Sequence, residues 1–292
     1  MNTLTFGRYS PYDTFVHRLD PRNKILMLIL LVVAVFFKFT IYSTTLIFSG
    51  TFLILLIILM LISKVRITSL LKALLGMWFL ILVLLAIYIL IPNSTYTHVA
   101  LNINGFKIYW DAFYQAGFII LRILLMLGLT MILTSTTKPM DLTYGLEWYM
   151  SPLKVIKFPA HIIAMMISIA LRFIPTLLEE TERIMKAQAS RGVDFSRGRL
   201  SKRLKAIISL IIPLLISAFQ RSDELAEAME IRGYDPNQKR TSFHKLRFSW
   251  RDLIGIFITL IIFGGTLAAF IIDKRVENID LIQLTFNINI GW

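Results

Sequence analysis

The sequence predicts an all-α, polytopic membrane protein with about five transmembrane helices and a cytoplasmic helical domain inserted before the last span. The first observation behind this prediction is composition: of 292 residues, 56% are hydrophobic and 17% are charged, with a mean hydropathy of +0.69. Soluble domains average about 25% charged residues. The second observation is a set of apolar runs near the roughly 20 residues that a membrane span needs. The absence of cysteine excludes disulfides and thiolate chemistry.

Four spans are expected in an N-terminal membrane domain, residues 1–134, and a fifth in a C-terminal part, 252–292, that ends in an outer tail. The expected spans are about 25–42, 44–63, 74–91, 112–134 and 253–272. The fourth contains Arg122, for which insertion scales give a cost of about 2.5–3.5 kcal/mol. Such an arginine either faces a partner or reaches an interface or a buried carbonyl.

Two further apolar runs, 162–171 and 206–219, contain only ten and fourteen residues, which is more typical of buried or interfacial helices than of spans. With five spans, 26 of the 31 Lys and Arg lie in inner loops. The positive-inside rule then predicts a multi-pass protein of the cytoplasmic membrane, with its N-terminus inside and its C-terminus outside. Counting both short runs as spans would give seven and would place a charge-rich stretch outside. We expect no removable signal peptide.

The cytoplasmic domain, residues 135–251, is expected to contain an internal repeat. Two long, proline-containing helices each begin apolar, become charged, and end in a related octapeptide: AQASRGVD at 187–194 and AMEIRGYD at 228–235. Both fit Ala-x-x-x-Arg-Gly-x-Asp, and Arg191 and Arg232 lie 41 positions apart. One such ending is an ordinary helix cap, because glycine accepts the left-handed conformation and arginine favours the negative end of a helix.

Two matching endings instead suggest two docking sites, because an arginine on a rigid helix tip can bind a carboxylate bidentately in an acidic groove. The expected docking residues are Ala187, Ser190, Arg191, Gly192, Asp194, Ala228, Ile231, Arg232, Gly233 and Asp235. The apolar first halves of the same helices need a cover, and we expect them to form a platform for a membrane partner. The expected platform residues are Ile162, Met165, Met166, Ile169, Phe173, Ile207, Leu210, Ile211, Leu214 and Leu215.

These features resemble the transmembrane T component of energy-coupling factor (ECF) transporters, which are ATP-driven importers. The similarity covers nearly the whole chain, including HRLDPRNK at 17–24, LRFIP at 171–175, both Arg-Gly endings and the final span. The resemblance implies a non-catalytic subunit that joins two ATPase subunits, as a homo- or heterodimer, to a small membrane-embedded S component that binds the substrate. In this family short X-Arg-X motifs at the ends of two coupling helices dock on the ATPases, and Ser190-Arg191-Gly192 and Ile231-Arg232-Gly233 match them.

The resemblance also implies uptake of vitamins or other micronutrients, with ATP and Mg bound by the ATPases and no cofactor in this chain. The first motif often reads Ala-Arg-Gly in the family, whereas Ser190 stands first here. No Gly-Lys dipeptide occurs, so a P-loop is excluded. The alternative is a membrane-anchored nucleic-acid-binding or scaffold protein. Acidic residues interleave with basic ones along both long helices, and this pattern argues against a nucleic-acid partner. The four His show no metal-binding spacing.

Overall fold

The computed structural model describes residues 10, 12–40, 42–90, 99–103, 106–152, 159–195, 200–235 and 248–289. The chain divides into two compact units. The first combines residues 1–138 with 246–292, and the second is residues 139–245. Apart from one two-stranded hairpin, the regular structure of the described residues is helical, which confirms the predicted all-α class.

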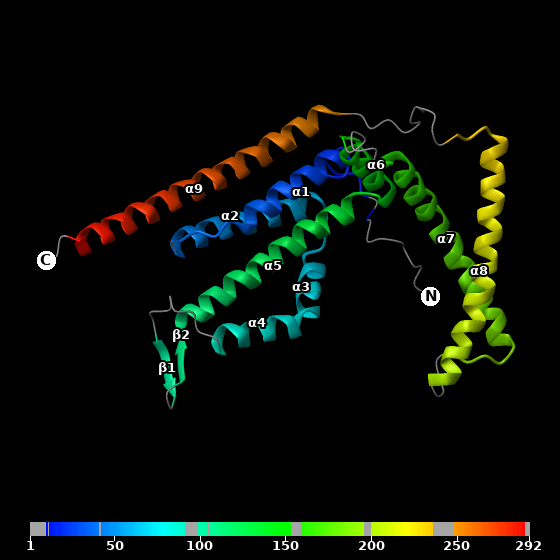
Figure 1. Cartoon of the computed structure of the whole chain (residues 1–292), viewed down its shortest axis with the longest axis horizontal. Coiled ribbons are helices and arrows are strands. Elements are labelled where there is room, and N and C mark those ends of the chain that lie inside the picture. The colour runs from blue at the N-terminus through cyan, green and yellow to red at the C-terminus, as the bar shows by residue number, and fades with distance from the viewer. Residues whose placement is uncertain are drawn as a thin grey trace. The chain divides into compact units, whose positions relative to one another are not determined.

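The first unit is a bundle of apolar helices (Figure 1). In chain order its helices are α1 (Pro21–Phe36), α2 (Tyr42–Ile62), α3 (Ile67–Gly76), α4 (Trp78–Leu90), α5 (Trp110–Thr136) and α9 (Trp250–Asn289). Helix α1 packs between α5 and α9, and α5 also contacts α2, α3 and α4. The antiparallel strands β1 (Val99–Ile103) and β2 (Phe106–Tyr109) lead into α5. No strand was expected in this part of the sequence.

The core of the first unit lies where α1, α2 and α5 meet. Its best buried side chains include Leu56 and Met60 of α2, which are 2% and 1% exposed. The Leu56 side chain of α2 packs directly against Gly128 of α5, where an added Cβ would lie 2.6 Å from a Leu56 methyl group. A helical glycine costs stability through chain entropy. Here the glycine leaves room for the buried Leu56 side chain, which would have to shift if position 128 carried a Cβ.

The HRLDPRNK segment holds together three elements that are far apart in the sequence. Asp20 accepts a hydrogen bond from the Arg22 amide at 2.9 Å and caps α1, with Pro21 in the first helical position. The Asp20 amide donates in turn to the buried Asp252 carboxylate, at 2.7 Å, at the start of α9. The motif thus fixes where α1 and α9 begin relative to one another.

Lys24 completes this connection from within the core. It is only 6% exposed, and its Nζ donates to the backbone oxygens of His17 and Thr136, at 3.1 and 3.0 Å, and to the Thr137 hydroxyl at 3.3 Å. Thr136 ends α5, so the ammonium lies at the negative end of that helix, where a cation is stabilised. Lys24 therefore acts as a structural bridge between α1 and α5.

The helices differ in two places from the spans expected in the first 134 residues. Helix α1 has 16 residues and ends at Phe36, several residues before the expected end of the 25–42 span. The expected 74–91 span is replaced by α3 and α4, which meet at a bend of 60°. Helix α9 runs without a break to Asn289, through the residues expected to form an outer tail.

Five helices within the described residues are long and apolar enough to cross a membrane, and a sixth span results if α3 and α4 count as one. Five is the expected number, but the set is different. It includes α2, α5 and α9 together with the two long helices of the second unit, and it omits α1. The chain is a multi-pass membrane protein, and hydropathy alone does not separate its spans from its other apolar helices.

The second unit contains α6 (Pro139–Met150), α7 (Ala160–Ser190) and α8 (Leu200–Ile231). Pro175 and Pro213 lie inside α7 and α8, so both long helices contain a proline as expected. Helix α7 runs away from α6 and α8 returns alongside it (Figure 1). The hydrogen bond between His161 Nδ1 and Glu147 Oε1, at 2.8 Å, joins the start of α7 to α6.

Candidate functional site

Both Arg-Gly motifs end their helices with the same backbone motif. After α7, the Gly192 amide donates to Ala189 O at 2.9 Å and the Val193 amide donates to Gln188 O at 3.0 Å. Gly192 has a φ of +84°, the left-handed conformation in which glycine has no steric penalty. This pair of hydrogen bonds is a Schellman motif, with Arg191 as the last residue before the left-handed position.

The second ending repeats this geometry residue for residue. The Gly233 amide donates to Glu230 O at 2.8 Å, the Tyr234 amide donates to Met229 O at 2.9 Å, and Gly233 has a φ of +66°. The glycines are therefore explained as caps. The arginines are explained only in part: a cation is favourable at the negative end of a helix, but the Schellman motif places no demand on the side chain that precedes the left-handed residue.

Both arginine side chains are exposed at the ends of their helices. Neither makes an ion pair with any residue that the structure describes. Ile231 beside Arg232 is 78% exposed, an unusual position for a large apolar side chain. Of the ten predicted docking residues nine are exposed, and Asp235 is half-buried. The two tips thus present a cation, and at the second tip an apolar side chain, to whatever lies beside them.

An interhelical ion pair joins α7 to α8. The Glu180 carboxylate, with a side chain 13% exposed, lies 3.6 Å from an Arg221 guanidinium nitrogen of α8. The same carboxylate accepts a hydrogen bond at 2.7 Å from Arg183, whose side chain is 77% exposed. Glu180 precedes Arg191 by eleven positions, and Arg221 precedes Arg232 by eleven positions. The ion pair therefore connects equivalent positions of the internal repeat.

This symmetry fixes the relation between the two tips. Helix α8 begins nine positions after Arg191 and returns along α7, so the two helix ends lie on opposite sides of the ion pair. With a rise of about 1.5 Å per residue and axes about 8–10 Å apart, the arginine Cα atoms are roughly 25–34 Å apart for crossings from perpendicular to antiparallel. Two tips at that spacing fit two separate grooves better than one.

The predicted platform is asymmetric. On α7, four of its five residues are half-buried, and Met166 is the exposed one, at 53%. On α8, Ile207, Ile211 and Leu215 are about half exposed, at 46%, 50% and 53%, whereas Leu210 and Leu214 are half-buried. Most of the uncovered apolar surface therefore belongs to α8.

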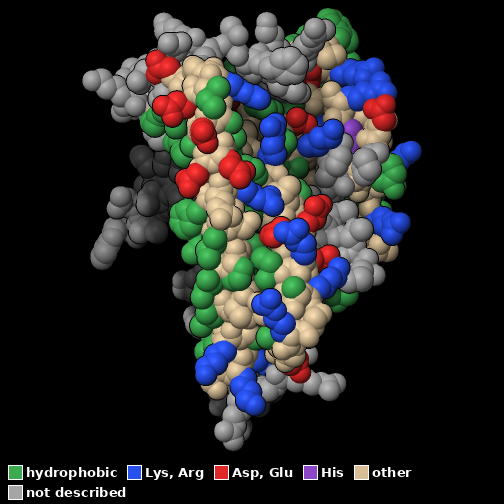
Figure 2. Space-filling view, turned by 90° about the vertical axis from the view of Figure 1, so that its right-hand side faces the viewer, with side chains coloured by type: hydrophobic (Ala, Val, Ile, Leu, Met, Phe, Trp, Pro, Cys, Tyr) green, Lys and Arg blue, Asp and Glu red, His purple; other side chains and the backbone are tan. Residues whose placement is uncertain are grey.

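Sequence reasoning missed several members of the α8 surface. The additional exposed side chains are Leu204, Ile208, Ile212, Ile216 and Phe219, each between 51% and 63% exposed. They follow helical spacing, and the signal was present in the uninterrupted apolar run of 206–219. Figure 2 shows hydrophobic side chains along one side of this face and a mixture of Lys, Arg, Asp and Glu over the rest. No wholly basic surface appears among the described side chains on this face.

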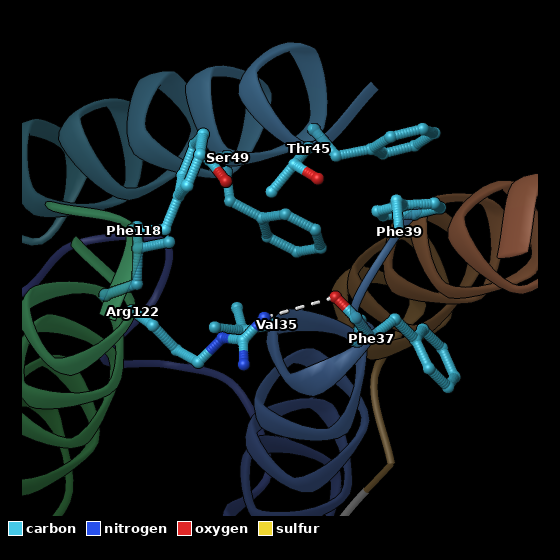
Figure 3. A pocket seen from close by; sticks show the side chains of 11 residues that line it. Val35, Phe37, Phe39, Thr45, Ser49, Phe118 and Arg122 are labelled. Carbon is cyan, nitrogen blue, oxygen red and sulfur yellow. Dashed lines mark hydrogen bonds between the residues drawn. The ribbon is translucent and has the colours of Figure 1, made fainter. Parts of the chain in front are cut away.

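Arg122, the charged residue of the fourth expected span, has a partner on another helix. Its guanidinium donates to the backbone oxygen of Phe37 at 3.3 Å (Figure 3). It also lies 5.8 Å from the centre of the Phe36 ring. Phe37 caps the C-terminal end of α1, whose last carbonyls have no partner within the helix. Of the alternatives that the sequence left open, the structure supports a backbone carbonyl, and this hydrogen bond is half-buried.

Comparison with known proteins identifies the family. The profile of the family described as "Cobalt transport protein" (CbiQ) matches residues 13–243. The chain is 40% identical over 267 residues to the "Energy-coupling factor transporter transmembrane protein EcfT" of Bacillus subtilis (strain 168), covering 91% of this chain and 98% of that protein.

Two further relatives bear the same name. The protein of Staphylococcus aureus (strain 04-02981) is 39% identical over 255 residues, covering 87% of this chain and 92% of that protein. The protein of Heliobacterium modesticaldum is 41% identical over 266 residues, covering 89% and 97%. The matched region includes the HRLDPRNK segment, both helix tips and the α8 surface. The chain therefore belongs to the EcfT/CbiQ family and is a transmembrane component of an energy-coupling factor transporter.

Proposed function

We propose that this chain is the non-catalytic coupling subunit of an ATP-driven ECF importer for vitamins or other micronutrients. In this proposal it receives motion from two ATPase subunits, a homo- or heterodimer, at Arg191 and Arg232, and passes it to a membrane-embedded S component that binds the solute. The observation that supports it best is the identical geometry of the two exposed arginine tips. ATP and Mg belong to the ATPases, and this chain binds neither.

The two helix tips are rigidly connected to the rest of α7 and α8, which suits the transmission of motion. Each arginine follows a helix of about 30 residues that is closed by two Schellman hydrogen bonds. The Glu180–Arg221 pair ties these helices together eleven positions before each tip. When the ATPases close and draw the docked tips toward one another, the pair acts as a pivot. The far ends of both helices, including the apolar start of α8, then move with them.

Docking of both tips on the ATPases requires that α7 and α8 do not both cross the membrane. Their apolar content permits two spans, but two antiparallel spans would place Arg191 and Arg232 on opposite sides of the bilayer. ATPases lie on one side only. We therefore propose that α7 and α8 form a cytoplasmic coupling domain at the inner membrane surface, with the N-terminus inside and the C-terminus outside. The mixed charges in Figure 2 fit a protein partner better than nucleic acid.

The apolar side of α8 is then the surface on which the S component lies. Eight large side chains of its first twenty residues are exposed, from Leu204 to Phe219. Leaving that much apolar surface in water is unfavourable by about 25 cal/mol per Å², so a partner or the lipid surface must cover it. Because apolar packing tolerates sliding better than directional hydrogen bonds, this surface suits a partner that tilts during transport.

The test is a pull-down of the tagged chain from native membranes. If each arginine is desolvated against a carboxylate, its loss costs about 3–5 kcal/mol, or roughly 10²–10³-fold in affinity, whereas an exposed pair contributes about 0–1 kcal/mol. The double variant Arg191→Glu/Arg232→Glu should lose both ATPases and keep a small membrane protein bound to the apolar surface.

A matched control is Arg66→Glu/Lys72→Glu, which makes the same charge change at two exposed positions, one just before α3 and one within it. It should retain both ATPases. If the tip variant is folded and still binds both ATPases as the wild type does, the arginines are ordinary helix endings and the proposal is wrong.

A further inference from the structure

A cavity of about 950 Å³ opens in the first unit, between the end of α1, the start of α2, and parts of α4, α5 and α9. It lies next to the Arg122 side chain seen in Figure 3. Its lining residues are Phe36, Phe37, Lys38, Phe39, Thr40, Thr45, Tyr88, Gln115, Phe118, Ile119, Arg122, Phe270 and Lys274. The volume lies within the range of about 300–1,000 Å³ typical of small-molecule sites.

Three cations, Lys38, Arg122 and Lys274, line this cavity, and no carboxylate is among its lining residues. They come from three different segments of the chain: the residues just after α1, the middle of α5, and α9. None of the three makes an ion pair with a residue that the structure describes. The nearby Asp273 is 7% exposed and accepts the Thr40 amide at 2.6 Å, so it holds the backbone rather than a cation.

Such an arrangement is costly in a membrane protein unless something neutralises it, because charged groups near hydrocarbon are unfavourable. The Phe37 carbonyl takes one of the five N–H donors of the Arg122 guanidinium. The Tyr88 hydroxyl on the wall of the cavity offers a further donor. The walls also offer phenylalanine rings, which suit an apolar chain. Cations and a hydroxyl around one space, with aromatic walls beside it, are the chemistry that recognises a phosphate on an amphiphile.

We propose that this cavity binds a phosphate group carried by the headgroup of an anionic phospholipid. Lys38 and Lys274 contact the phosphate as mobile cations at the mouth. Arg122, fixed by the Phe37 carbonyl and the Phe36 ring, supplies hydrogen bonds from the inner wall. A bound lipid would hold the end of α1 against α5 and α9. This site is separate from the helix tips and does not depend on the ATPases or the S component.

The test compares lipid binding to the full-length chain in detergent, by native mass spectrometry with phosphatidylglycerol, phosphatidylcholine and inorganic phosphate. Wild type should bind phosphatidylglycerol more tightly than phosphatidylcholine. The variant Lys38→Gln/Lys274→Gln keeps Arg122 in place and should bind phosphatidylglycerol about 30-fold more weakly, from the usual contribution of each basic residue to anionic-lipid binding.

The control Arg66→Gln/Lys72→Gln removes two exposed cations that lie outside the cavity. It should change phosphatidylglycerol binding by less than about twofold, because general surface attraction is weak and diffuse. Equal losses in the two variants, or equal binding of both lipids by wild type, would overturn the proposal. Binding of inorganic phosphate that requires Lys38 and Lys274, without preference for the lipid, would support the phosphate site and assign it to a free anion.

Discussion

The ion pair between Glu180 and Arg221 provides the sharpest test of how the two tips are held. We consider replacing Glu180 with Gln and Arg221 with Gln, singly and together. The matched control is Arg183→Gln, because Arg183 bonds the same carboxylate more closely, at 2.7 Å, but from within the same helix. If the interhelical pair positions the tips, loss of Arg221 must disturb the distance between the tips more than loss of Arg183 does, although Arg183 is closer to Glu180.

The expected magnitude follows from distance and exposure. Charges 3.6 Å apart attract by about 4–5 kcal/mol at an effective dielectric constant near 20. Solvent screening reduces this strongly, because the Arg221 side chain is 34% exposed. We expect a net coupling of about 1 kcal/mol, a roughly fivefold change in the population of the joined helices. For the Arg183 pair, with one side chain 77% exposed, about 0.3–0.5 kcal/mol is typical.

The assay is a distance measurement by double electron–electron resonance. The chain has no cysteine, so labels at Ala187→Cys and Ala228→Cys are unique. Both sites are exposed and lie seven positions beyond the ion pair. The helix rise and the usual interaxial distance put their Cα atoms roughly 17–23 Å apart.

The distance distribution should broaden in Glu180→Gln and in Arg221→Gln, by similar amounts. The double variant should broaden no further, because the same contact is lost in each. Arg183→Gln should leave the wild-type distribution in place. Equal effects of Arg183→Gln and Glu180→Gln, or additive effects of Glu180→Gln and Arg221→Gln, would refute the role of this pair as a pivot.

Three other predictions concern the first unit, and each is measured as thermal stability of the full chain in detergent. Lys24→Met should destabilise by about 1–3 kcal/mol, because it leaves two backbone carbonyls and a hydroxyl without their donor; exposed Lys72→Met should change little, and equal effects would contradict the bridge. Gly128→Ala should destabilise by about 1–3 kcal/mol through its clash with the neighbouring leucine of α2, whereas Gly117→Ala, on the same helix with open space around it, should stabilise by about 0.5–1 kcal/mol; a stable Gly128→Ala protein would count against the close approach. Desolvation lowers the pKa of His17 below its usual value, against the hydrogen bond to the Ser10 carbonyl, which raises it. The unfolded chain therefore takes up this proton at a higher pH than the folded chain, so stability is full above about pH 6.5 and falls as the pH drops through the folded-state pKa. Wild type should lose more stability between about pH 7.5 and 5.5 than His17→Gln, and identical pH dependence in both would exclude this origin.

Local sequence patterns predicted the endings of α7 and α8 well. Glycine after a long amphipathic run predicts a left-handed cap, and both Gly192 and Gly233 have positive φ. The repeat of 41 positions also indicated two equivalent helices. That the same repeat places Glu180 against Arg221 could have been inferred only by assuming an antiparallel pair. The docking role of the arginines stays a prediction.

Contacts between residues far apart in the sequence determine the features that local sequence patterns did not predict. Hydropathy extended the first span to residue 42, but the chain leaves the helix after Phe36. The segment that follows α1 makes two hydrogen bonds to residues far away in the sequence. Arg122, 85 positions from Phe37, donates to the Phe37 carbonyl, and the Thr40 amide donates to the carboxylate of Asp273, 233 positions away. Lys24 was counted among the inner basic residues that orient the protein. Its burial at the end of α5 depends on a segment 112 positions away.

Apolar composition was also insufficient to separate spans from surface helices. The apolar runs in α7 and α8 are too short for spans on their own, yet the helices that contain them have 31 and 32 residues and are long and apolar enough to cross a membrane. What distinguishes them is the position of charge: each has an apolar first half and a charged second half. The pairing of their two tips, rather than hydropathy, is the argument for placing them on one side of the membrane.

The most direct test of the account is the accessibility of the two tips. Ala187→Cys and Ala228→Cys, each alone in the cysteine-free chain, are treated with a membrane-impermeant maleimide in right-side-out and inside-out vesicles. The account predicts that both sites react only from the cytoplasmic side, and that bound ATPase subunits protect both. Reaction of either site from the outer side would show that the two tips do not share the cytoplasmic side, and would contradict the proposed placement of α7 and α8. Reaction that bound ATPase subunits do not reduce would show that the tips do not dock on them.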